Sequence, residues 1–127
     1  MANRRKYLQI ALLVFGIIAL LLYPLMLFWP SGWAWTPGQH EYEQMMSGIY
    51  ATLGVFLIWA SREPEAHLTF IWFTVWSSVV HGGIMAIQAI VDHSERGHLI
   101  GDVPALFIVA IVLAVLTPRR AAAADTL

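Results

Sequence analysis

Four long runs of apolar residues, nearly free of charged side chains, constrain this chain more than any other feature. They cover about residues 7–29, 42–60, 68–91 and 99–117, and in the second run the uncharged part begins at Met45. A helix that crosses a hydrocarbon core of about 30 Å needs roughly 20 such residues. The runs therefore predict four membrane-spanning helices, followed by a cytoplasmic tail over residues 118–127.

Composition favours a membrane protein over a water-soluble bundle. The chain is 59% hydrophobic and 12% charged, whereas roughly a quarter of the residues of a soluble domain are charged. The loops between the runs are short, and short loops connect antiparallel neighbours. We predict a single all-α domain over residues 1–127, folded as an integral membrane bundle of four antiparallel helices.

The basic residues gather at one end of the predicted spans. These are Arg4, Arg5, Lys6, Arg62, Arg119 and Arg120, and Arg96 alone falls at the other end. The positive-inside rule then predicts that both termini are cytoplasmic, in a multi-pass protein of the bacterial inner membrane. Seven Lys and Arg against eight Asp and Glu leave no concentrated basic patch for nucleic acid, so the predicted surroundings are the lipid bilayer and partner subunits.

The third run carries a polar stripe. At 100° per residue, one face of a helix collects His67, Thr74, Ser77, Ser78, His81, Met85, Gln88 and Asp92. Polar side chains are costly in hydrocarbon, so the stripe is predicted to face the bundle interior or water. His81 lies near the middle of the run and needs a hydrogen-bond partner, either on its own helix or on a neighbouring one.

The same stripe predicts a cofactor site formed by His81, Ser77, Ser78 and Gln88. A tetrapyrrole would take His81 as its ligand, because the small Ser77 and the glycines Gly82 and Gly83 leave space for a ring. A quinone would instead accept a hydrogen bond from His81. Simple packing of His81 against a neighbouring helix is the alternative to both.

Histidines and carboxylates gather at the end of the predicted bundle opposite the basic residues. They include His40, Glu43, Asp92, His93, His98 and Asp102. Because the chain has no cysteine, a divalent metal bound there would take these imidazole and carboxylate ligands. Two structural roles compete with this prediction. Asp102 could cap the fourth helix ahead of Pro104, and the small-residue face formed by Ser47, Ala51 and Gly54 of the second run favours close helix packing.

Three short segments carry a resemblance to known proteins. Residues 48–57 (GIYATLGVFL), 81–83 (HGG) and 97–104 (GHLIGDVP) resemble a family of small bacterial four-span proteins of unknown function, similar in plan to the DoxX-like superfamily. DoxX-like members include membrane subunits associated with quinone-linked oxidoreductases, so the resemblance implies an accessory redox role. It supplies no active-site motif, and no catalytic residue is carried over to this chain.

These observations predict a non-catalytic subunit, or a homo-oligomeric component, of a larger membrane assembly, in which His81 packs or binds a cofactor. One alternative is a small proton- or ion-coupled transporter that uses a relay from Asp92 through Gln88 and His81. Another is a metal-binding membrane protein that uses the histidines and carboxylates of the outer face. The residue types and spacings leave all three functions open.

Overall fold

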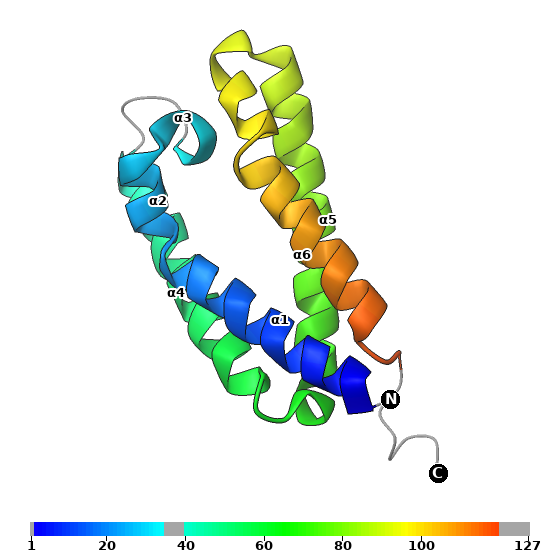
Figure 1. Cartoon of the computed structure of the whole chain (residues 1–127). Helices are drawn as coiled ribbons and strands as arrows, with labels where there is room; N and C mark the ends of the chain where they lie inside the picture. The colour runs from blue at the N-terminus through cyan, green and yellow to red at the C-terminus, as the bar shows by residue number, and fades with distance from the viewer. Residues whose placement is uncertain (1, 35–39, 120–127) are drawn as a thin grey trace.

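A computed structural model describes residues 2–34 and 40–119 of the chain. The elements are α1 (Ala2–Leu20), α2 (Leu22–Phe28), α3 (Pro30–Trp33), α4 (His40–Ala60), η1 (Pro64–His67), α5 (Leu68–Val91), η2 (His93–Leu99) and α6 (Asp102–Leu116) (Figure 1). No strand occurs in the described ranges, which confirms the all-α prediction there. Residues 120–127 of the predicted tail lie outside the described residues.

Two helical segments, Pro64–Val91 and His93–Leu116, are long and apolar enough to cross a membrane. The pair Asn3–Leu20 and Leu22–Phe28 makes a third if the two bent helices form one span. Large apolar side chains such as Phe73, Trp76 and Val80 are more than half exposed along the outside of α5. A surface of this kind is favourable in lipid and costly in water, which suggests a membrane protein.

The first predicted span is broken near its end. A bend of 55° separates Asn3–Leu20 from Leu22–Phe28. Proline lacks the backbone N–H that would bond to the carbonyl four residues earlier, and its ring clashes with that carbonyl. For Pro24 this carbonyl belongs to Leu20, the last residue of α1. Pro24 therefore accounts for the bend, which lies one turn before the proline itself.

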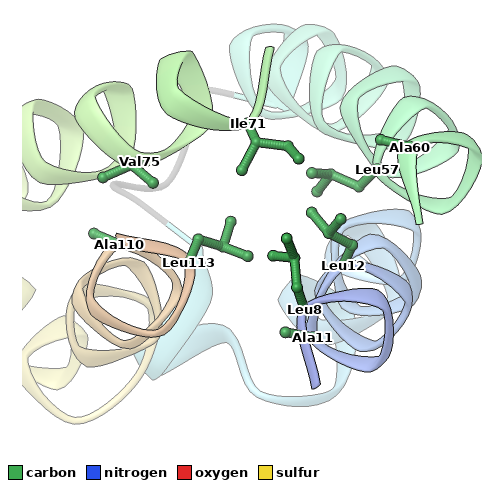
Figure 2. Close-up of a cluster of buried hydrophobic side chains, with 9 residues drawn as sticks. All are labelled: Leu8, Ala11, Leu12, Leu57, Ala60, Ile71, Val75, Ala110 and Leu113. Atoms are coloured by element: carbon green, nitrogen blue, oxygen red, sulfur yellow. The ribbon is translucent and has the colours of Figure 1, made fainter. Parts of the chain in front are cut away.

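The helices form two pairs. α1 lies beside α4, and α5 lies beside α6 (Figure 1). The two pairs meet in a hydrophobic core near the start of α1, where side chains from all four helices point toward one another (Figure 2). This core consists of Leu8, Ala11, Leu12, Leu57, Ala60, Ile71, Val75, Ala110 and Leu113.

Two glycines bring α1 and α4 into close contact. A Cβ atom added to Gly16 would lie 2.8 Å from the carbonyl oxygen of Gly54, and one added to Gly54 would lie 2.5 Å from that of Gly16. These separations are too short for real side chains, so both positions require glycine. Gly54 belongs to the small-residue face predicted for the second run, and at this position the face does permit close approach.

Polar contacts join the two pairs at the end where the core lies. Arg4 on α1 donates to the carbonyl oxygens of Val115 and Leu116 at 2.9 and 3.1 Å, which satisfies two carbonyls at the end of α6. The Arg5 guanidinium forms an ion pair with Glu65. The start of α1 is thereby tied to both η1 and the end of α6.

At the opposite end, α3 packs against η2. A Cβ atom on Gly97 would overlap the carbonyl of Ser31, and one on Gly101 would overlap the carbonyl of Gly32. The backbones of the two segments therefore touch directly. The molecule is thus closed at one end by the hydrophobic core and at the other by α3 and η2. Between these two ends, the helix pairs are separated by a space.

Candidate functional site

A partly open cavity of about 540 Å³ occupies this space. Most of its lining is apolar, and it is built from both helix pairs. The lining residues are Phe15, Ile18, Ala19, Leu22, Met26, Trp33, Tyr42, Glu43, Met46, Tyr50, Leu53, Leu57, Thr74, Ser78, His81, Met85, Gln88, Asp102, Ala105, Leu106 and Val109. A concave, mainly apolar site with a few polar groups is the usual form of a small-molecule site.

The polar stripe of α5 runs along this cavity. Five of its eight predicted members line the wall: Thr74, Ser78, His81, Met85 and Gln88. Ser77 does not line it, and its hydroxyl donates to the carbonyl oxygen of Thr74 at 3.2 Å. The ring of His67 lies 6.0 Å from that of Trp59, and Asp92 is exposed beyond the helix end. Of the predicted cofactor residues, His81, Ser78 and Gln88 are thus brought together and Ser77 is not.

Tyr50 of α4 is the partner of His81. Its hydroxyl is hydrogen-bonded to His81 Nδ1, and the two ring centroids are 5.7 Å apart. Within the described part of the chain, His81 Nε2 has no hydrogen-bond partner. When the tyrosine O–H donates to Nδ1, Nε2 carries the ring proton and becomes a donor into the cavity.

Sequence reasoning missed Tyr50, although it anticipated a partner on a neighbouring helix. A signal was available, because Tyr50 comes three residues after Ser47 and four before Gly54. It therefore belongs to the same face of α4 as the small residues that were singled out.

A second polar cluster lies where η2 meets α6. Asp102 lines the cavity, and its Oδ1 is 2.7 Å from Nδ1 of the fully buried His98. The other ring nitrogen, Nε2, donates to the carbonyl oxygen of Ala34 at 2.8 Å and lies 3.2 Å from the Glu95 carboxylate. α6 has no side-chain cap, so the carboxylate of Asp102 binds His98 and does not cap the helix as predicted.

The described members of the predicted metal set are spread over several places. His98 and Asp102 are paired, and Glu43 lines the cavity from α4. Asp92 and His93 are exposed at the start of η2. The side chain of His40 lies outside the described residues. Within the described ranges, no group of three or more histidines and carboxylates is arranged to hold a metal ion.

Asp92 has a local role instead. Its Oδ1 accepts hydrogen bonds from the backbone N–H and the hydroxyl of Ser94, at 2.9 and 2.7 Å, and caps η2. These hydrogen bonds hold the pKa of Asp92 below its usual value. The Asp92 backbone N–H donates to the carbonyl oxygen of Gln88 at 2.9 Å, as part of the end of α5. Among the described residues, no side-chain hydrogen bond joins Asp92 to Gln88 or His81, the next members of the predicted relay.

The space predicted for a tetrapyrrole beside the glycines is filled by α6 at Gly82 and lies on the outside of the molecule at Gly83. A Cβ atom on Gly82 would already contact Leu106 and Phe107 of α6, each at 3.3 Å. Gly83 has no neighbouring atom within 4 Å. Neither glycine lines the cavity. The glycines therefore serve helix packing and the outer surface, and the open space lies on the other side of His81.

Trp33 adds one further polar group to the cavity wall. Its indole nitrogen is buried, and no described residue accepts a hydrogen bond from it. A buried donor of this kind is costly unless a ligand or water satisfies it.

A family model matches the chain over residues 2–126, and its description is a family of unknown function. The searches of the curated proteins and of the solved structures gave no match.

Proposed function

The chain belongs to the DUF6632 family, a family of unknown function, and we propose that it is a membrane-embedded binding protein. In this proposal a hydrophobic small molecule occupies the cavity between the two helix pairs, and His81 hydrogen-bonds its polar group. The Tyr50–His81 pair carries the proposal, because it orients one imidazole so that the second nitrogen is available in a mainly apolar space. The molecule would be a bound ligand, with no reaction assigned to the protein.

The ligand must offer a hydrogen-bond acceptor on an apolar body. A quinone carbonyl meets that requirement and would accept from His81 Nε2. A flat tetrapyrrole has less support, since its predicted space beside Gly82 is filled by α6. Ser78 and Gln88, which lie on the same wall, supply further polar contacts.

The membrane arrangement that accompanies this proposal has four spans. The helix α4 has 21 residues, about 31 Å at 1.5 Å per residue, and its exposed side chains include Ile49, Val55 and Phe56. Its two early glutamates, Glu41 and Glu43, would lie near the outer interface. Both termini would be cytoplasmic in a bacterial inner membrane, since Arg4 and Arg5 lie at the same end as Arg62 and Arg119.

The protein would act as a non-catalytic subunit or homo-oligomeric component of a membrane assembly. The DoxX-like plan of the sequence implies an accessory redox role of this kind. The extensive exposed apolar surface of α5 and α6 is compatible with partner helices as well as with lipid.

Binding of a neutral probe to the protein in lipid nanodiscs tests the proposal. Triphenylphosphine oxide is suitable, because it combines an apolar body with one strong acceptor oxygen, and equilibrium dialysis against empty nanodiscs corrects for partition into lipid. We expect saturable binding that weakens about tenfold in His81→Ala, the effect of one lost hydrogen bond. The matched control is His67→Ala, which removes a histidine outside the cavity. Equal binding by the wild type and His81→Ala would contradict the proposal.

A further inference from the structure

The cavity is acidic at one end. Glu43 from α4 and Asp102 from α6 both line it, and its lining includes neither lysine nor arginine. On α4, Glu43 lies seven residues before Tyr50, and on the facing wall Gln88 of α5 lies seven residues after His81. Seven residues make two helical turns, or about 10 Å. The carboxylates thus lie toward the end closed by α3 and η2, beyond the Tyr50–His81 pair.

The two carboxylates differ in their partners. Asp102 is bonded to His98, which can carry the compensating positive charge. Glu43 has no ion-pair or hydrogen-bond partner among the described side chains. A carboxylate facing an apolar space without a cation is unfavourable, and a positively charged ligand group would relieve that cost.

The rest of the lining suits a large cation. Aromatic faces attract cations, and Trp33, Tyr42 and Tyr50 all line the cavity. Methionine is polarizable and adapts its shape to different apolar ligands. Met26, Met46 and Met85 supply three such side chains, one from each of α2, α4 and α5.

We propose that the cavity binds a lipophilic cation, a hydrophobic molecule whose positive group lies beside Glu43 and whose apolar body extends toward Leu53 and Val109. This inference rests on the proposed function and names the ligand class of the same cavity. A neutral quinone does not belong to this ligand class, because it has no positive group that would pair with Glu43. Asp102, already bonded to His98, would contribute to the negative potential without direct pairing.

Tetraphenylphosphonium and triphenylphosphine oxide test the inference as a pair, since both carry several phenyl rings on phosphorus and only the first is charged. Both are measured by equilibrium dialysis against the protein in nanodiscs of zwitterionic lipid. We expect the cation to bind at least tenfold more tightly than the oxide because of Glu43, although only the oxide has an acceptor oxygen for His81. Glu43→Gln should remove this preference while changing binding of the oxide by less than twofold. Glu41→Gln is the matched control, because it makes the same change two residues earlier, at an exposed position outside the cavity.

The outcomes distinguish the proposed ligand class from the proposed binding function on which it rests. Loss of cation preference in Glu43→Gln, and its retention in Glu41→Gln, would support the lipophilic cation. Equal binding of the cation and the oxide, or equal effects of the two substitutions, would overturn that ligand class and leave the binding function standing. Failure of both probes to bind above empty nanodiscs would overturn the function and the inference together.

Discussion

His98 and Asp102 form a buried pair, with Nδ1 of the imidazole 2.7 Å from Oδ1 of the carboxylate. Because His98 also donates to the carbonyl oxygen of Ala34, the pair connects the start of α6 to the backbone that follows α3. The same carboxylate lines the cavity. One pair of side chains therefore links the closure of one end of the molecule to the wall of its candidate site.

Replacing His98 by alanine should destabilise the protein strongly. The change would leave the carboxylate of Asp102 buried without its partner, and the loss of one member of a buried pair costs about 3–5 kcal/mol. Thermal unfolding in detergent, followed by tryptophan fluorescence, measures the effect. His93→Ala is the control, because His93 is exposed in the same short helix. Similar unfolding temperatures for the two variants would show that the pair does not stabilise the fold.

The close contact of Gly16 with Gly54 predicts opposite effects of alanine at two positions of α4. Gly54→Ala should lower stability by about 1–3 kcal/mol, since its methyl group would overlap the backbone of α1. Gly48→Ala should be neutral or stabilising by up to about 1 kcal/mol, because open space surrounds Gly48 and alanine favours a helix. Unfolding of both variants under identical conditions checks the difference in sign. An unchanged stability in Gly54→Ala would mean that the helices separate at little cost.

Two tryptophans should respond differently to replacement by phenylalanine in the ligand-free protein. Trp72 donates from Nε1 to the carbonyl oxygen of Pro118 at 3.0 Å, and its replacement should cost about 1 kcal/mol for the lost hydrogen bond. Trp33→Phe should cost less, because its buried N–H has no acceptor among the described residues. The comparison is of unfolding free energies. A larger loss in Trp33→Phe would contradict this expectation and indicate that water satisfies the indole.

The lowered pKa of Asp92 predicts a pH-dependent contribution to stability. Because folding lowers this pKa, the ionised carboxylate favours the folded state, and its contribution is complete above the unfolded value of about 4. The contribution is lost as pH falls through the folded value. The unfolding temperature of the wild type should therefore exceed that of Asp92→Asn at pH 7, and the difference should decline below pH 4. A difference that stays constant from pH 7 to pH 3 would contradict this assignment.

The bounds of three apolar runs lie close to those of helices, whereas the first run, residues 7–29, is divided between α1 and α2. The third predicted span, residues 68–91, has the same bounds as α5, and the second and fourth differ from α4 and α6 by a few residues at their ends. Charged residues end the apolar runs, but they do not always end the helices, since α1 extends through Arg4, Arg5 and Lys6. The short helices α3 and η2 were not anticipated, because four to seven residues carry too little periodicity to separate a helical turn from a loop.

The candidate site was only half predictable. The stripe on α5 could be identified because the residues of one helix face follow from their spacing alone. The pairing of His81 with Tyr50 joins residues 31 apart in sequence, and it depends on which helices are neighbours. The cavity depends on the arrangement of both helix pairs, which are held together at the two ends of the molecule and separated between them. Hydropathy shows which residues avoid water, but not how far apart two apolar helices will lie.

The hydrophobic core combines the first and last of the described helices, since Leu8 and Leu12 of α1 pack in the same cluster as Leu113 of α6 (Figure 2). Among the described helices, α6 is synthesised after α1, α4 and α5, so the core is incomplete until α6 has been made. The hydrogen bonds from Arg4 to the carbonyl oxygens of Val115 and Leu116 likewise cannot form until the end of α6 has been made. Until α6 has been made, α1 therefore lacks part of its packing surface, and the cavity lacks the wall that Asp102, Leu106 and Val109 supply.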